Sequence, residues 1–244
     1  MEKVRALHLV NGIEEGTPLK QYMDLDYLLQ MLETNQYHVN RKYTFEDALE
    51  GNFPTNRVFP VTAVGENIPL QPKQDVDVCL NVWKSIQKNR IVPTSCWTHN
   101  MEDRMVMWKN YTPKFGACIK STVNKVVASI ENNDYDIWCG KITYDGYYAQ
   151  KGLVANLFSK ATVYSEEEEC RFYFFEYKQP NYTLPYIKID INPSVMIDEI
   201  ILSPFIVSRA AKKLAEFITA CYRIDNVKQS KLNHSALKVQ RFYK

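Results

Sequence analysis

The segment 95–122 constrains the fold of this chain more than any other stretch. It begins with a strand-like end at 95–98, continues into an amphipathic stretch, and closes on small and β-branched residues. Bulky apolar side chains recur at helical spacing in its middle part, namely Met101, Met105 and Trp108. This spacing predicts a helix over 101–111, and the composition of 115–121 predicts a buried strand.

Similar patterns recur along the rest of the chain. The clearest helix is predicted over 208–222, which carries one apolar stripe, and strict alternation over 186–191 predicts a half-buried strand. A further helix follows Asp24 and ends at Thr34 and Asn35. The other predicted elements are helices at 75–89 and 123–132 and strands at 37–41, 91–98, 137–144, 163–177, 199–203 and 223–229.

These elements predict a single α+β domain over 1–244, with helices around an antiparallel or mixed sheet. A chain of 244 residues can bury a full core, and no linker divides it convincingly. We expect a leader or edge strand at 1–18, a proline-rich loop or insertion at 52–74, and a basic tail at 230–244.

The composition indicates a cytoplasmic protein of a reducing compartment. The six cysteines are scattered without a Cys-x-x-Cys pair, so we expect them to be reduced and mostly buried. The sequence shows no signal-peptide core and no membrane-length apolar segment, and we expect no membrane partner. A net charge of +2 gives no argument for nucleic-acid binding, although a local basic groove stays open.

Several short motifs follow one another over roughly residues 20–235. They are Tyr22-Met23-x-Leu25, Asn40-Arg41-x-x-x-Phe45-Glu46-Asp47-x-x-Glu50-Gly51, Ser95-Cys96-Trp97, Met107-Trp108-x-x-Tyr111, Gly116-x-Cys118-Ile119, Glu167-x-Glu169-x-Arg171 and Ile200-x-x-Ser203-Pro204. In their joint order the chain resembles the bacterial family named domain of unknown function 2971. That family has no established activity, so the resemblance implies no reaction.

The first part of the chain carries a second resemblance. A tyrosine, a leucine-rich helix and a short strand that ends in arginine are similar to the first motif of toxin-type ADP-ribosyltransferases that modify DNA. In those enzymes the first motif holds NAD and a late glutamate carries the chemistry. The resemblance implies an ADP-ribosyltransferase-like fold. It also implies NAD binding by Tyr22 and Arg41 and catalysis by Glu167 or Glu169. Tyr22 stands where those enzymes carry His or Arg.

The acidic run at 166–169 is the strongest electrostatic feature of the sequence. If it belongs to one strand, then Glu167, Glu169 and Arg171 share a face, and the two carboxylates lie about 7 Å apart. One carboxylate could then bind a ribose hydroxyl and stabilise an oxocarbenium-like transition state, while the other orients or deprotonates the acceptor. The alternative is a solvated start of a strand, in which Arg171 only balances charge.

Arg41 also has two interpretations. It could bind a pyrophosphate through its guanidinium group, or it could form an ion pair with a neighbouring acid. The acids in question are Glu46, Asp47 and Glu50, which could alternatively hold Mg²⁺ because hard cations prefer oxygen ligands.

The aromatic residues of the segment 95–122 suit either a ligand or a core. Trp97, Trp108 and Tyr111 could stack on a planar ligand, and they could equally fill the interior of the sheet and helix. We predict that four residues from distant parts of the sequence line one cavity: Tyr22, Arg41, Trp97 and Glu169.

Three functions from different classes stay open. The first is an NAD-using transferase or glycohydrolase, such as a bacterial toxin or phage-defence effector. It would take NAD as substrate and a nucleic acid or protein as acceptor, and it would require no metal. The second is a non-catalytic module that binds a nucleotide or a partner protein in the aromatic cleft. The third is a metal-dependent nuclease that uses the acids around 46–50 together with Glu167 and Glu169.

Overall fold

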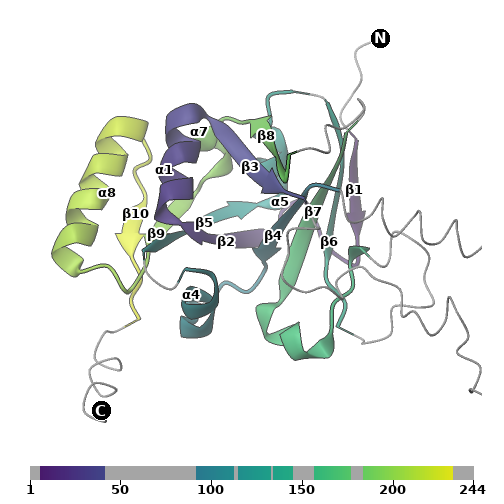
Figure 1. Ribbon diagram of the computed structural model, residues 1–244, viewed down its shortest axis with the longest axis horizontal. Coiled ribbons are helices and arrows are strands. Elements are labelled where there is room, and N and C mark those ends of the chain that lie inside the picture. Colours follow the sequence, from purple (N-terminus) through teal and green to yellow (C-terminus); the bar gives the residue numbers. More distant parts are fainter. Residues whose placement is uncertain are drawn as a thin grey trace, which may run out of the picture.

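An eight-stranded mixed sheet forms the centre of the structure, a computed structural model that describes residues 6–41, 92–112, 115–132, 134–144, 157–176 and 184–232 (Figure 1). In spatial order its strands are β1 (Leu7–Val10), β6 (Tyr135–Lys141), β7 (Glu169–Glu176), β4 (Thr94–Thr98), β2 (Pro18–Asp24), β5 (Gly116–Thr122), β9 (Glu199–Leu202) and β10 (Val227–Gln229). The two outermost pairs are parallel, and the pairs between them are antiparallel.

A two-stranded sheet and the helices lie around this centre. The small sheet pairs β3 (Gln36–Asn40) with β8 (Tyr186–Asp190). The helices are α1 (Leu25–Thr34), α4 (Met105–Tyr111), α5 (Val123–Ala128), α7 (Pro193–Met196) and α8 (Ser208–Tyr222), with a 3₁₀ turn, η2 (Thr162–Glu167). Helices around a mixed sheet confirm the α+β class predicted from the sequence.

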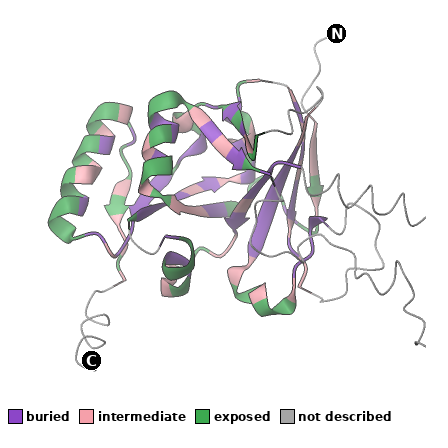
Figure 2. Cartoon of the chain, viewed as in Figure 1, coloured by how far each residue is buried: buried purple, intermediate pink, exposed green. Residues whose placement is uncertain are grey.

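The two faces of the sheet differ in character. One face contributes Leu19, Ile119 and Phe172 to the main hydrophobic core, which α1, α5 and α8 also join. The opposite face at β2 and β5 is covered by α4, whose Trp108 packs in a smaller cluster with Cys118 (Figure 1). Figure 2 shows the buried residues concentrated along β7 and its neighbours, with exposed positions on the outer sides of α1 and α8.

Most predicted elements are present, with shifted ends. Helix α8 has the predicted bounds, and β1 lies at an edge of the sheet, within the segment 1–18. Helix α4 begins at Met105, later than predicted, because Arg104 is extended and Asn100 Oδ1 accepts a hydrogen bond from the backbone of Glu102. The predictions for 42–91, which include the loop at 52–74, lie outside the described residues, as does most of the tail.

The strand predicted over 163–177 is wrong at its start. Residues 162–167 form the turn η2, and Glu168 adopts the left-handed conformation with φ 44° before β7 begins at Glu169. An extended strand cannot run through such a residue, so the acidic run lies mostly before the strand.

Candidate functional site

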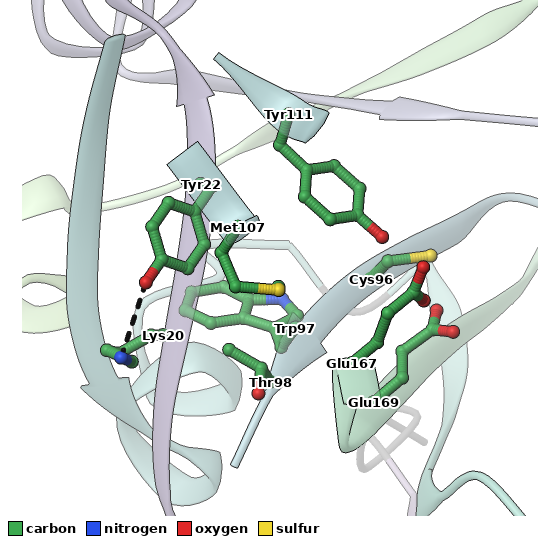
Figure 3. A pocket seen from close by; sticks show the side chains of 9 residues that line it. All are labelled: Lys20, Tyr22, Cys96, Trp97, Thr98, Met107, Tyr111, Glu167 and Glu169. Atoms are coloured by element: carbon green, nitrogen blue, oxygen red, sulfur yellow. Dashed lines mark hydrogen bonds between the residues drawn. The ribbon is translucent and has the colours of Figure 1, made fainter. Parts of the chain in front are cut away.

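A cavity opens on the polar face of the sheet, between β2, β4, the start of β7 and helix α4 (Figure 3). Its volume is about 30 Å³. Nine residues line it: Lys20, Tyr22, Cys96, Trp97, Thr98, Met107, Tyr111, Glu167 and Glu169. Their segments lie far apart in the sequence, so the cavity is a product of the sheet topology.

Strand register explains why these side chains meet. Thr98 lies directly opposite Lys20 on β2 and opposite Glu169 on β7. Side chains of directly opposed residues project from the same face of a sheet, and so do residues two apart along one strand. Lys20 and Tyr22 on β2, Cys96 and Thr98 on β4, and Glu169 on β7 therefore share one face.

Glu169 is buried and held by two cations. Arg171 donates from Nε to Oε1 at 2.6 Å and from a terminal nitrogen to Oε2 at 2.9 Å, and Lys160 Nζ donates to Oε2 at 3.2 Å. Burial alone would raise the pKa of Glu169, but the charge and hydrogen bonds of Arg171, together with Lys160, lower it to about 2. The carboxylate is ionised at neutral pH.

Glu167 also lines the cavity, but it belongs to the turn η2 and not to the predicted strand. It ends η2 and is separated from β7 by the left-handed Glu168, so the predicted shared strand face of Glu167, Glu169 and Arg171 is wrong for Glu167. Its Oε2 accepts a hydrogen bond from Lys160 Nζ at 2.6 Å, so one ammonium group joins both carboxylates. The Glu167 side chain is 14% exposed, against 5% for Glu169. Glu167 is therefore the more accessible of the two acids.

The aromatic walls of the cavity are uncharged at neutral pH. Burial raises the pKa of Tyr22, with further contributions from Cys118 and Asp103. Burial also raises the pKa of Tyr111, and the Glu167 carboxylate adds to this effect. Both phenols therefore keep their protons, and the phenol of Tyr111 donates to the Glu167 carboxylate.

Lys20 forms the inner wall next to Tyr22. Its ammonium donates to Tyr22 Oη at 3.4 Å, the dashed line in Figure 3, and to the carbonyl of Glu102. Burial lowers the pKa of Lys20, because removal from water disfavours the charged form. Lys20 thus helps to fix the orientation of the Tyr22 ring against α4.

The structure brings together five of the seven predicted site residues. Those that line the cavity are Tyr22, Trp97, Tyr111, Glu167 and Glu169. Trp97 also packs into the main core, and its Nε1 donates to Ser95 Oγ at 2.7 Å. Figure 3 shows the phenol of Tyr111 and the thiol of Cys96 directed toward the two carboxylates.

Trp108 and Arg41 do not line the cavity, contrary to the prediction. Trp108 is fully buried behind Tyr22, at 4.9 Å between ring centroids, and its Nε1 donates to Asp103 Oδ1 at 2.7 Å. It is a core residue, which was the alternative interpretation.

Arg41 is buried at the far end of β7 from Glu169. It donates to Glu176 Oε2 at 3.0 Å and to the carbonyl of Leu184 at 3.1 Å. Arg41 thus forms an ion pair with Glu176, whereas the sequence named three other acids as its possible partners. Those three acids, Glu46, Asp47 and Glu50, lie outside the described residues.

Five residues of the site were not predicted as site residues: Lys20, Cys96, Thr98, Met107 and Lys160. Alternation around the buried Leu19 could have pointed to Lys20, since residues next to a buried strand position face the other side. Met107 was predicted only as part of a helix. Lys160, which joins both carboxylates, has no pattern in the sequence that indicates its role.

Two further features bear on the open functions. Across the described ranges, no group of three or more His, Cys, Asp or Glu side chains could hold a metal ion. Among the helices that the structure describes, none is long and apolar enough to cross a membrane. Comparisons of the chain with protein-family models, curated proteins and solved structures give no match.

Proposed function

We propose that this protein is an NAD-using enzyme that cleaves the N-glycosidic bond of NAD at the cavity between β2, β4, α4 and β7. It would act as an ADP-ribosyltransferase or an NAD glycohydrolase. The observation that carries this proposal is the convergence of two carboxylates with the rings of Tyr22 and Tyr111 at one cavity.

The chemistry of the bond suits this combination of groups. The nicotinamide ring of NAD is planar and cationic, and aromatic rings attract a cation over their faces. When the glycosidic bond breaks, positive charge develops on the ribose, and a fixed ionised carboxylate stabilises that charge. Neutral nicotinamide then leaves, and water or an acceptor bonds to the ribose carbon.

Glu167 and Glu169 take different roles in this proposal. Glu167 is the more exposed acid and lies next to Tyr111, so we assign to it the contact with the ribose and its developing charge. Glu169 is engaged by Arg171 and Lys160 and acts as a positioning residue, because Lys160 in turn holds Glu167.

The test is release of nicotinamide from NAD by the purified protein, with and without DNA, RNA and protein acceptors. We expect Glu167→Gln to lower the rate by about 10²-fold or more, since single charge-stabilising groups typically contribute that much. Glu166→Gln is the matched control, because Glu166 belongs to the same acidic run and its side chain is 80% exposed. Absence of release by the wild type under all these conditions, or equal rates for Glu167→Gln and the wild type, would refute the proposal.

A second candidate is a non-catalytic module that binds a nucleotide in the same cavity. Arg171 is completely buried and makes two hydrogen bonds to Glu169. This arrangement also suits a purely structural ion pair, and a structural role for Glu169 favours a function without catalysis. Saturable binding of NAD without any turnover would support this second function.

A further inference from the structure

A second and larger cleft adjoins the first cavity. Its volume is about 240 Å³. Its walls come from β2, α1, β3 and the end of α4, and its lining residues are Gln21, Tyr22, Met23, Asp24, Tyr27, Gln30, Met31, Gln36, Tyr37, His38, Asn40 and Tyr111. Tyr22 and Tyr111 line both spaces, so the two cavities share a wall.

The chemistry of the second cleft differs from that of the first. Aromatic rings and side-chain amides predominate, and the ring of Tyr27 is 54% exposed on α1. None of the twelve described lining residues is lysine or arginine, and Asp24 contributes a carboxylate. Burial, with the charge of Lys188, lowers the pKa of His38, so its imidazole is neutral at pH 7.

Such a lining matches a planar ligand with a polar edge better than a phosphate. An exposed phenol ring provides a surface on which a flat heterocycle can stack. The Gln21 and Gln36 amides are hydrogen-bonded within the protein. The amides of Gln30 and Asn40, with the Asp24 carboxylate, can donate to and accept from the edge of that heterocycle. A phosphate group would find the Asp24 charge here and no cation among the described lining residues.

We propose that this second cleft binds a nucleobase, stacked on Tyr27 and read at its edge by the surrounding amides. The inference deepens the proposed function and rests on it only for the identity of the ligand. The base is either the adenine of NAD, which reaches past Tyr22 and Tyr111 from the first cavity, or the base of an acceptor that receives ADP-ribose.

The test is calorimetric titration of the protein with adenosine, guanosine, cytidine and thymidine. We expect at least one nucleoside to bind, and Tyr27→Ala to weaken that binding by roughly 5- to 150-fold, which corresponds to the loss of one stacked base. Tyr27→Phe retains the ring and should retain the binding. Phe217→Ala is the matched control, since Phe217 is a comparably exposed aromatic residue on α8 and should leave binding unchanged.

Competition with NAD distinguishes the two sources of the base. Displacement of the bound nucleoside by NAD would assign the cleft to the adenine of NAD, whereas simultaneous binding of both would assign it to an acceptor. No saturable binding of any of the four nucleosides at millimolar concentration, or equal affinity for Tyr27→Ala and the wild type, would overturn the inference. Failure of the proposed function would look different, because nucleoside binding that depends on Tyr27 would persist without nicotinamide release.

Discussion

Among the carboxylates that the structure describes, Glu169 has the environment that departs furthest from that of an exposed carboxylate. Its pKa is about 2 in the folded protein, against an ordinary value of 4.5. A carboxyl group whose pKa is lower in the folded than in the unfolded protein stabilises the fold at every pH above the unfolded-state pKa. This stabilisation is lost as the pH falls from about 4.5 to about 2. Since each pKa unit corresponds to 1.36 kcal/mol, the ionised Glu169 contributes about 3 kcal/mol to the unfolding free energy at neutral pH.

The first prediction is that Glu169→Gln flattens the acid limb of the stability curve. Urea unfolding at steps from pH 7 to pH 3 should show a smaller loss of unfolding free energy below pH 4.5 in Glu169→Gln than in the wild type. Glu166→Gln should keep the wild-type slope, because the Glu166 side chain is 80% exposed. Identical slopes for all three proteins would contradict the assigned role of Glu169.

Arg171 provides a second prediction at the scale of one residue. It is fully buried and paired with Glu169, so Arg171→Ala leaves a buried carboxylate with one cation fewer. We expect a loss of about 3–5 kcal/mol in unfolding free energy, the range for removing one partner of a buried ion pair. The control is Arg209→Ala on the exposed side of α8, which should change stability by less than about 1 kcal/mol. Equal small losses in both variants would mean that the buried pair contributes nothing to stability.

Individual site residues could be predicted from the sequence where their chemistry is unusual for their position. The acidic run led to Glu167 and Glu169, the clustered aromatic residues led to Trp97 and Tyr111, and the family resemblance of the first part of the chain led to Tyr22. These five residues line the cavity. Trp108 and Arg41 belong to the core and to a buried ion pair, because burial depends on partners that local sequence does not reveal.

Among the elements, β6 provides a test of close packing between neighbouring strands. A Cβ added at Gly140 would lie 2.3 Å from Val10 Cγ2 and 2.9 Å from the ring of Phe158. We expect Gly140→Ala to destabilise the protein by about 1–3 kcal/mol, the usual cost of overpacking. Gly16→Ala has open space around the added Cβ and serves as the control. Equal melting temperatures for the two variants would contradict the close packing of Val10 and Phe158 against β6.

Elements with strong local periodicity were predicted well, and those set by a single backbone conformation were not. The apolar stripe of α8 and the alternation of β8 follow directly from their sequences. The start of β7 depends on the left-handed conformation of Glu168, and the start of α4 depends on contacts of Asn100 and Lys20 with Glu102. The Lys20–Glu102 contact joins separate segments, whereas the other two features are local backbone geometry. Hydrophobic periodicity indicates neither kind.

At the scale of the whole molecule, the cysteines test the predicted reducing environment. The five described cysteines are free thiols, and Cys139 and Cys170 lie 3.8 Å apart between sulfur atoms in the core. We expect native alkylation to modify the exposed Cys221 first and to reach Cys118, Cys139 and Cys170 only after denaturation. Mass spectrometry of the denatured, unreduced protein should find all six thiols free, and a deficit of two or more would contradict this account.

The order of strands in the sheet is the part of the fold that the sequence leaves open. Strand β7 lies between β6 and β4, and β2 lies between β4 and β5, so the strands that build the cavity are separated by many residues. Local patterns predict that a strand exists and which of its faces is apolar, but not its partner. The cavity therefore became visible only when the register of β2, β4 and β7 was known.

The central claim is that the cavity between β2, β4, α4 and β7 holds the reactive half of NAD. A crystal structure of Glu167→Gln soaked with NAD tests it most directly, because this variant should bind the dinucleotide and cleave it slowly. We predict density for the nicotinamide ring against Tyr22 and Tyr111, with the ribose next to residue 167. Density for NAD at another place on the protein, or an empty cavity in crystals of a variant that binds NAD in solution, would contradict the account.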